Sequence, residues 1–403
     1  MVVHGPYPIG EARVLREARA AVDAGFEVDV VAMANPGELR RSRVDGVEIY
    51  RLPYLRSTRS HPATLVSEYA GFTGLATLAV ARLHVVRRYG VIHVHNPPDF
   101  LVASALLPRL SGAKLIFDVH DLAPELFALR LAGRRWARAA ERALRITESV
   151  ATRVSDAVVT VHEPYRQELL ARGVPDEKIV VVLNALDERL VPSGPPPVAE
   201  EGVFRVVYHG TVTPHYGVEL LVDAFAAVAG EIRGARLDVY GGGDAVPSVR
   251  ERVEQLGIGD RVHVGGRVLP QEEVLGRVRG ASVGVASQLP LERNQTALPT
   301  KLLEFVALGV PVVAADAPAI TDSFTEDEIV FFRGGDAMSL ADALRRVAAD
   351  PAAARRRAEA ATRRYRRAYS WSIYAERYVQ LLEALIAEPG RGGRATSETT
   401  SAS

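Results

Sequence analysis

Lys301 and Glu304 are two charged residues whose types and spacing could serve to bind a nucleotide. They lie three residues apart in a predicted helix, so their side chains share one face. A cation in the first helical turn opposes the helix dipole, and this placement becomes favourable if an anion such as a phosphate also binds there. The Glu304 carboxylate could accept hydrogen bonds from a ribose diol. A surface Lys–Glu pair on an ordinary α/β helix has the same spacing, and spacing alone favours that simpler interpretation.

The neighbouring residues predict a capped helix followed by a buried strand. Thr300 is a suitable N-cap, Gly309 suits the end of the helix, and Pro311 prevents the helix from continuing. Residues 312–315 then form a short apolar run that ends at Asp316, as expected of a buried strand.

The composition is that of a soluble globular protein with several domains. The 403 residues are too many for one core and suggest about two or three domains. Hydrophobic residues make up 48% and charged residues 24% of the chain. The 49 basic and 49 acidic residues give a formal net charge of zero, so no attraction of the whole molecule to nucleic acid is indicated. The absence of cysteine excludes disulfides, thiolate catalysis and cysteine-ligated zinc.

The sequence shows no uninterrupted apolar run of the about 18 residues that a membrane span needs. Residues 71–81 form the best candidate, but the run is short and contains Thr73 and Thr77. The N-terminus lacks a basic stretch followed by an apolar run and a cleavage site. We therefore expect a cytoplasmic protein.

If the arginine-rich stretch 130–153 is helical, its arginines share a face that could meet anionic lipid headgroups, although Glu141 and Glu148 favour a solvated face.

Apolar Val/Ile runs alternate with helical patterns in both halves of the chain, which indicates parallel strands covered on both faces. The expected strands are residues 1–4, 28–32, 47–50, 91–95, 114–117, 157–161, 179–182, 204–210, 236–240, 262–264, 282–285, 312–314 and 329–332. This pattern predicts two doubly wound α/β domains in tandem, each with a ligand crevice at the carboxyl ends of its strands.

The expected domain boundaries follow from composition. Residues 191–202 contain four prolines and few apolar anchors, which predicts a linker between a domain at 1–190 and a second domain at 203–368. Residues 369–388 predict a helix, with an apolar stripe formed by Tyr374, Tyr378, Leu381, Leu382 and Leu385. The tail at 389–403 is small and polar, and we expect it to be disordered.

Histidines at predicted strand ends are further candidates for chemistry. His120 follows a strand, where a neutral imidazole could hold a substrate or receive a proton, or simply bond to loop backbone. Asp118 and Asp121 could orient His120 or cap a helix. His93 and His95 alternate along one strand and are expected to face opposite sides, so no shared metal site is predicted.

The glycines at 241–243, followed by Asp244, lack the full spaced-glycine fingerprint of a dinucleotide loop. They are interpreted as a tight strand-to-helix turn, which makes an NAD-dependent dehydrogenase the least favoured function.

Taken together, the sequence resembles a retaining glycosyltransferase of the GT-B fold, from the large family 4 (bacterial group 1 glycosyltransferases). Residues 206–211 with 215–221 resemble the strand and loop that open the donor domain of that family. Residues 298–305 with 311–313 resemble its donor-binding helix. Residues 117–125 resemble an acceptor-domain loop that reaches the reaction centre. Residues 10–18 and 25–28 add weaker agreement. The agreement of all three stretches favours the nucleotide-binding interpretation of Lys301 and Glu304.

The resemblance implies two Rossmann-like domains that face a central cleft, with a nucleotide sugar in the cleft and a C-terminal helix that returns to the first domain. It implies that Glu304 holds the ribose hydroxyls, that Lys301 and nearby amides face the diphosphate, and that His120 lies beside the anomeric carbon. His120, Lys301 and Glu304 are thus the expected catalytic residues. The expected donor-binding residues are Gly10, His209, Gly210, Thr211, Thr296, Pro299, Thr300, Leu302 and Leu303. The expected acceptor residues are His95, Asn96, Asp121 and Glu125.

The chain departs from the family pattern at three positions. Thr296 stands where many relatives carry a Glu, so no negative charge is available there for a developing oxocarbenium ion. Thr211 and Tyr216 stand where many relatives carry Arg and Lys. Neutralisation of the diphosphate would then depend on Lys301, with His209, Arg267 or Arg293 as further candidates.

The expected activity is transfer of a sugar from a nucleoside diphosphate sugar to an acceptor hydroxyl, with retention, by front-face attack and without a metal or other cofactor. The acceptor could be a saccharide, a lipid-linked saccharide or a small molecule, and peripheral association with the inner membrane face is a further expectation. No nucleic-acid partner is expected. A GT-B-fold sugar-nucleotide epimerase or hydrolase, and a non-catalytic nucleotide-sugar-binding protein, are the alternatives.

Overall fold

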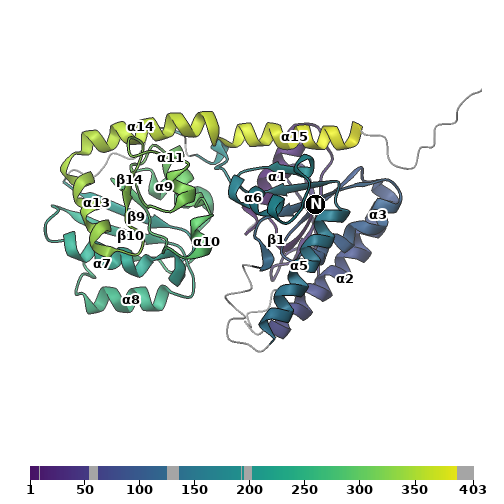
Figure 1. Ribbon diagram of the computed structural model, residues 1–403, viewed down its shortest axis with the longest axis horizontal. Coiled ribbons are helices and arrows are strands. Elements are labelled where there is room, and N and C mark those ends of the chain that lie inside the picture. The colour runs from purple at the N-terminus through teal and green to yellow at the C-terminus, as the bar shows by residue number, and fades with distance from the viewer. Residues whose placement is uncertain (9, 54–61, 125–135, 192, 195–201, 388–403) are drawn as a thin grey trace, which may run out of the picture. The chain divides into compact units, whose positions relative to one another are not determined.

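The computed structural model describes residues 1–8, 10–53, 62–124, 136–191, 193–194 and 202–387. The chain forms two compact units: unit 1 is Met1–Val182 with Ala375–Ser403, and unit 2 is Leu183–Tyr374 (Figure 1). The first boundary therefore lies at Val182, whereas the sequence suggested residue 190. The expected tail and most of the expected linker lie outside the described residues.

Unit 1 is built on an eight-stranded sheet in the order β3-β4-β2-β1-β5-β6-β7-β8. Its strands are β1 (Val2–Pro6), β2 (Asp29–Met33), β3 (Arg41–Val44), β4 (Val47–Leu52), β5 (Val91–His95), β6 (Lys114–Val119), β7 (Ala157–Thr160) and β8 (Ile179–Val181). Neighbouring strands run parallel except for β3 and β4. The strand order reverses at β1, and such a switch point places a ligand crevice at the carboxyl ends of the strands.

The antiparallel hairpin of β3 and β4 is an element that the apolar pattern does not predict. Its first strand has the sequence Arg-Ser-Arg-Val and no apolar alternation. Asp45 and Gly46 join the two strands with φ angles of 50° and 81°. Two successive residues with positive φ form the tight turn that Asp-Gly pairs favour. The Asp-Gly pair was therefore the sequence signal for this hairpin.

The described helices of unit 1 are α1 (Ala12–Asp23), α2 (Pro62–Arg87), η1 (Asp99–Ala105), α3 (Leu106–Leu110), α5 (Ala137–Val154) and α6 (Glu163–Ala171). Phe72 of α2, Leu101 of η1 and Ala151 of α5 join the strands in one hydrophobic core. These contacts place α2, η1 and α5 against the sheet of unit 1 (Figure 1).

Helix α2 is longer and more apolar than the sequence analysis allowed. Thr64–Arg87 are long and apolar enough to cross a membrane by length and composition, and 22% of the most apolar window is buried. The threonines do not end the apolar segment, because the Thr77 hydroxyl donates a hydrogen bond to the Thr73 carbonyl within the helix (2.7 Å). The expectation from uninterrupted apolar runs was therefore too strict for this segment.

Unit 2 is built on a six-stranded sheet in the order β11-β10-β9-β12-β13-β14, in which all neighbouring strands run parallel. The strands are β9 (Phe204–His209), β10 (Ala235–Tyr240), β11 (Val262–Val264), β12 (Val283–Ala286), β13 (Val312–Ala315) and β14 (Val330–Phe332). The helices include η4 (Pro214–Tyr216), α7 (Val218–Val228), α8 (Val246–Gln255), α9 (Gln271–Val278), α10 (Glu292–Gln295), α11 (Thr300–Ala307), α12 (Pro318–Thr321), α13 (Ala337–Ala349) and α14 (Pro351–Ala368). Two parallel-sheet, Rossmann-like domains confirm the expected fold class.

The last described helix, α15 (Trp371–Ala387), begins in unit 2 and continues into unit 1. Tyr378 and Leu382, from its apolar stripe, are buried. The Tyr378 hydroxyl lies 2.9 Å from Nδ1 of His93 on β5. The second half of α15 thereby completes the packing of unit 1.

Candidate functional site

Helix α11 begins directly after Pro299, at the carboxyl-terminal side of the sheet in unit 2. Pro299 is the N-cap and Thr300 is the first helical residue, so the expectation that Thr300 caps the helix is wrong. No side chain caps the helix, which leaves the amides of the first turn without a side-chain acceptor at the N-cap. Gly309 has a φ of 71° just after the helix, and this left-handed conformation explains why the helix ends there.

Lys301 points into the interior of unit 2 and is only 7% exposed. Its ammonium donates a hydrogen bond to the Tyr208 hydroxyl (2.7 Å) and lies 4.1 Å and 4.2 Å from the ring centroids of Tyr208 and Tyr216. Burial lowers the pKa of Lys301 to about 7, although Glu304 opposes this shift. The interpretation as an ordinary surface Lys–Glu pair is therefore wrong. Among the described residues, no carboxylate forms an ion pair with this ammonium.

Glu304 is held one turn further along α11 by two polar neighbours. Gln271 Nε2 donates to Glu304 Oε1 (2.8 Å), and His209 Nδ1 lies 3.4 Å from Glu304 Oε2. Burial, followed by the nearby charge of Lys301, lowers the pKa of His209 to about 3. His209 is therefore neutral at neutral pH, which removes it from the candidates for neutralising a diphosphate. Its buried Nε2 has no hydrogen-bond partner among the described residues.

Close backbone approach brings the ends of β9 and β10 next to Lys301. Gly210 has a φ of 109°, and a Cβ at this position would lie 3.3 Å from Lys301 Cε. A Cβ at Gly241 would lie 1.9 Å from the Gly210 carbonyl oxygen. The glycines after β10 therefore serve a tight backbone approach. This agrees with their interpretation as a turn.

A cavity of about 250 Å³ opens at the ends of β10 and β11 in unit 2. Its lining residues are Tyr240, Gly241, His263, Gly265, Arg267, Leu269 and Arg277. The Arg277 guanidinium lies 5.4 Å from the centroid of the Tyr240 ring. Apart from Arg267, sequence reasoning missed these residues. Their positions just after two strand ends were the available signal, since ligands in such sheets bind at the carboxyl ends of strands.

The other expected donor residues in unit 2 differ in what they present. The side chains of Leu302 and Leu303 are buried in the core, so only their backbone amides can reach a ligand. Thr211 is exposed after β9, and Thr296 is half-buried after α10. For Arg293, only the backbone is described.

Unit 1 contains a second polar group of residues, which is almost wholly buried. Arg13 donates to both carboxylate oxygens of Asp118 (2.8 Å and 3.0 Å) and lies 3.2 Å from Glu17. His95 Nδ1 lies 3.1 Å from Asp118 Oδ2 and 3.1 Å from His120 Nε2. His120 Nε2 also lies 3.2 Å from Asp118 Oδ2, so one carboxylate orients both imidazoles. Of the two roles expected for Asp118, this geometry agrees with orienting His120 and not with capping a helix.

His93 and His95 face the same side of β5, which corrects the sequence analysis. Their ring centroids are 4.1 Å apart, and both rings approach Asp118. Side chains alternate along a strand, so residues two apart share a face, and the expectation of opposite faces misapplied this period.

Charges in this buried group are balanced. Burial opposes ionisation of Asp118, but the Arg13 guanidinium and His120 hold its pKa well below its usual range. Burial raises the pKa of Glu17 well above its usual value and lowers that of His93 to about 4. Arg13 and Asp118 therefore form a charged pair in this group, whereas burial disfavours the charged forms of Glu17 and His93.

A metal ion is the alternative occupant of this group. Glu17, His93, His95 and Asp118 each offer a ligand atom, and these atoms lie within 4.8 Å of one another. Arg13, however, already supplies a positive charge to both carboxylates, and a cation placed between them would meet this guanidinium. We assign no metal here, and metal independence stays a prediction.

The expected acceptor residues are held mainly by the loop after β5. Asn96 donates to Asp99 Oδ1 (2.9 Å) and to the Asp121 carbonyl (2.8 Å), and its own oxygen accepts from the His120 amide (2.7 Å). Asn96 and His95 are buried, so these two residues position the loop that carries His120. The His120 side chain is 17% exposed and can contact a substrate. Glu125 lies outside the described residues.

Gly10 lies just before α1 in unit 1, where Glu11 is the N-cap and caps no amide with its side chain. The φ of Gly10 is 106°, a conformation that glycine readily adopts. The helix start near Gly10 therefore remains available for the phosphate approach that the resemblance implies.

Acid should destabilise unit 1 because its buried histidines take up protons poorly. Burial lowers the pKa values of His93 and His162 to about 4, from ordinary values of 6.5. The unfolded chain therefore binds more protons between these two values, and stability is lost as pH falls from about 6.5 to about 4. Urea unfolding followed by circular dichroism at pH 7 and pH 5 should show a lower midpoint at pH 5. The difference should shrink in His93→Gln, and an equal difference in both proteins would contradict this cause.

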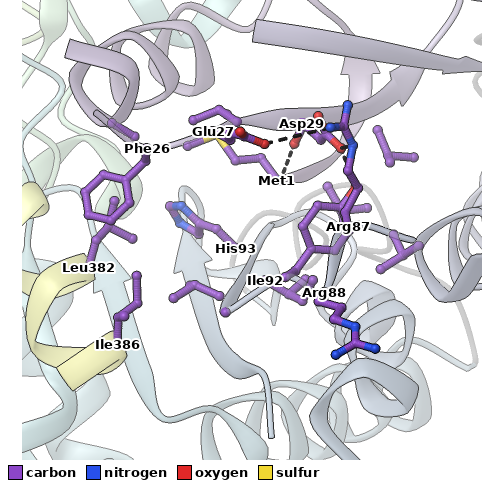
Figure 2. A pocket seen from close by; sticks show the side chains of 18 of the residues that line it. Met1, Phe26, Glu27, Asp29, Arg87, Arg88, Ile92, His93, Leu382 and Ile386 are labelled. Atoms are coloured by element: carbon purple, nitrogen blue, oxygen red, sulfur yellow. Dashed lines mark hydrogen bonds and ion pairs between the residues drawn. The ribbon is translucent and has the colours of Figure 1, made fainter. Parts of the chain in front are cut away.

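A cavity of about 250 Å³ in unit 1 lies at the opposite ends of the strands (Figure 2). Figure 2 shows His93, Ile92, Leu382 and Ile386 around it, together with Arg87 and its ion pair to Asp29. The cavity adjoins the amino ends of β1, β2 and β5, whereas His120 follows the carboxyl end of β6. Sheets of this type bind substrates at their carboxyl ends, so this cavity is not part of the candidate site.

Two family models match the chain. A glycosyl transferase 4-like domain matches residues 10–185, and glycosyl transferases group 1 match residues 203–350. An exopolysaccharide phosphotransferase of Streptomyces coelicolor is 29% identical over 203 residues, which are 49% of this chain and 20% of that protein. The chain thus matches only about a fifth of the length of this curated relative.

Two solved structures share the fold over nearly the whole chain. A sucrose-phosphate synthase from Thermosynechococcus elongatus has a TM-score of 0.71 at 22% identity, covering 96% of both chains. HepE from Anabaena, in complex with UDP-glucose, has a TM-score of 0.71 at 15% identity, covering 95% of this chain and 98% of that chain. At these identities, the likenesses establish the fold and leave the chemistry to the site itself.

Proposed function

Because the chain belongs to the group 1 glycosyltransferases of the GT-B fold, we propose that it transfers a sugar from a nucleoside diphosphate sugar to an acceptor hydroxyl. The observation that carries this proposal is the buried ammonium of Lys301 at the uncapped start of α11, which forms no ion pair with a carboxylate of the described residues. A buried cation is costly unless an anion joins it, and a diphosphate is such an anion.

The donor would be bound by three parts of unit 2. Its diphosphate would lie at the start of α11, where Lys301 and the first-turn amides neutralise the charge of the leaving group. Its ribose hydroxyls would bond to the carboxylate of Glu304, which Gln271 holds in place. Its base would enter the cavity beside Tyr240. A neighbouring fold solved with UDP-glucose supports a nucleotide sugar as the donor class.

His120 is assigned to the sugar and acceptor side of the reaction. Asp118 and His95 fix its ring, and its partly exposed edge can hold a hydroxyl or accept a proton. We propose retention of anomeric configuration by front-face attack, with no metal. The relative named as an exopolysaccharide phosphotransferase supports a place in polysaccharide assembly, ahead of glycolipid or metabolite glycosylation.

A nucleotide-sugar-binding protein without catalysis is the second candidate. It is favoured by Tyr216, whose ring covers Lys301 at a position where many relatives carry a lysine. Tight donor binding with no product across an acceptor panel would support it. Steady hydrolysis or epimerisation of the donor without any acceptor would instead support the hydrolase or epimerase alternative.

The donor is best identified by a thermal-shift panel of nucleoside diphosphate sugars, because preferential binding raises apparent stability. The preferred donor is then incubated with an acceptor panel, and the product is read by NMR. We expect the linkage to keep the anomeric configuration of the donor. An inverted linkage would reject the proposed mechanism but leave sugar transfer intact.

Glu304→Ala and His120→Ala are expected to reduce turnover to near background while the protein stays folded. Glu304→Ala should chiefly weaken donor binding, because it removes the acceptor for the ribose hydroxyls. His120→Ala should leave donor binding largely unchanged and lower kcat. Steady-state kinetics and donor thermal shifts separate the two effects. Near-normal turnover in both variants would reject this site.

A further inference from the structure

The outer surface formed by α2, α3 and α5 carries most of the exposed large apolar side chains of unit 1. Leu78 is 69%, Val86 is 80% and Leu110 is 86% exposed. The other exposed apolar residues on these helices are Val66, Val85, Leu106, Leu107, Ile146 and Val150. We refer to these nine residues and the helices that carry them as the α2–α3–α5 surface. A concentration of exposed apolar side chains on neighbouring helices indicates an interaction site.

Helix α2 is apolar on its outer face as well as its inner face. Phe72, Ala76 and Val80 point into the core of unit 1. Val66 and Leu78 lie on the opposite side, in a row of exposed residues spaced four apart that also includes Ala70, Gly74, Arg82 and Val86, so that Arg82 is its one charged member. A surface helix of a soluble protein normally presents polar residues there. Glu68 adds no charge to this outer face, because its side chain is buried against His4.

The three helices belong to one layer. Both α2 and α5 pack against η1, while α3 follows η1 directly and contacts α2. Figure 1 shows α2, α3 and α5 grouped on one side of unit 1. Their outward side chains therefore form a single face of that unit.

Exposed arginines lie on the same helices as these apolar residues. The exposed arginines that carry this argument are Arg82 on α2 and Arg138, Arg142 and Arg153 on α5. Arg87 is also exposed, but it is paired with Asp29 (3.3 Å). The glutamates of α5 do not balance them: Glu148 is buried in an ion pair with Arg172 (2.7 Å), and Glu141 is paired with Arg145 (3.2 Å). The face is thus basic, although the whole chain has a formal net charge of zero.

We propose that the α2–α3–α5 surface docks on a lipid bilayer that contains anionic headgroups. Apolar side chains and arginines on the same helices match the acyl boundary and the phosphates of such a bilayer, and arginine stems extend along apolar surface toward anionic headgroups. The helix lies on the bilayer and does not cross it, because Phe72, Ala76 and Val80 must stay packed on the sheet. This inference does not depend on the proposed sugar transfer.

The test is flotation of the full chain with vesicles in the absence of any nucleotide sugar. Wild type should bind vesicles of mixed phosphatidylcholine and phosphatidylglycerol more strongly than pure phosphatidylcholine vesicles, and less strongly at high salt. Leu78→Glu/Leu110→Glu should weaken binding by about tenfold or more, since it removes two apolar side chains from the interface. Met338→Glu, at an exposed apolar position in unit 2, is the matched control and should bind as wild type does.

Charge is tested separately. Arg138→Glu/Arg142→Glu should abolish the preference for phosphatidylglycerol, whereas Arg355→Glu/Arg356→Glu, at exposed positions on α14, should keep it. Thermal unfolding checks that each variant is folded. The proposal is overturned if wild type does not bind anionic vesicles, or if the surface and control variants bind equally. It is also overturned if the surface variants change only self-association in sedimentation velocity, which would make this face a contact between two copies.

Discussion

Lys301→Met is expected to lower kcat/KM for the donor by about 10²–10³ while leaving the fold at least as stable as wild type. The ammonium of Lys301 lies between two tyrosine rings and forms its hydrogen bond to the Tyr208 hydroxyl. Methionine has a similar length and needs no counter-charge in the interior. We therefore expect that Lys301 contributes to anion binding and lowers the stability of the fold.

The pH dependence provides the sharper test of this prediction. The pKa of Lys301 is about 7 in the folded protein and 10.5 ordinarily, so the unfolded chain binds more protons between these values. Stability should therefore rise as pH increases from about 7 to about 10.5, and this slope should be smaller in Lys301→Met. Urea unfolding at pH 7 and pH 9 measures it, provided that the two units are followed through one transition at a time.

Binding of a diphosphate should reverse the shift, because an anion favours the charged lysine. UDP binding above pH 7 should therefore take up a proton, which isothermal calorimetry detects as a dependence on buffer ionisation enthalpy. Lys178→Met is a suitable control, since Lys178 bonds to the Ser155 carbonyl in unit 1. Unchanged donor affinity in Lys301→Met would remove the buried ammonium from the mechanism, even if the sugar-transfer activity were confirmed.

The second large effect is expected at Asp118, which accepts two hydrogen bonds from Arg13 in the interior of unit 1. Removing one partner of a buried ion pair typically costs about 3–5 kcal/mol, because the other charge is left uncompensated. Glu17 lies 3.2 Å from Arg13 and can ionise in place of Asp118, since Asp118 is one of the groups that raise its pKa. Asp118→Asn should therefore cost less than this full amount, and Asp118→Asn/Glu17→Gln should reach it.

Urea unfolding of these variants, with Arg13→Met in a double-mutant cycle, apportions the energy. Asp118→Leu/Arg13→Met should be more stable than Asp118→Asn/Glu17→Gln, because it leaves no buried arginine unpaired. The exposed pair of Arg252 and Asp223 (2.6 Å) is the control, and Asp223→Asn should cost at most about 1 kcal/mol. Similar costs at both sites would mean that Asp118 is not paired as described.

Activity provides a second readout at Asp118. Because Asp118 orients His120 and His95 by their Nε2 and Nδ1 atoms, its loss should also lower kcat in variants that remain folded. A structural role alone would leave kcat of the folded fraction unchanged. Asp118 is accordingly a positioning residue for His120.

Local sequence determined the elements and the positions of the key side chains along them. The Val/Ile runs identified β5 as residues Val91–His95 and most other strands within a few residues, because parallel strands buried on both faces require continuous apolar runs. Spacing also placed Lys301 in the first turn of a helix that ends before Gly309. The prediction of Thr300 as the N-cap was wrong by one residue, because the cap is set by backbone conformation. Pro299 has the extended conformation of an N-cap, and Thr300 is already helical.

Only the tertiary structure decided which of these residues share an environment. Lys301 contacts Tyr208, 93 positions away, and Arg13 contacts Asp118, 105 positions away. Burial and the resulting pKa shifts depend on such contacts, which no local pattern encodes. The sequence therefore located a lysine at a helix start, whereas the fold removed that lysine from water. A buried ammonium has lost its hydration, so its charged form is stabilised when an anion binds beside it.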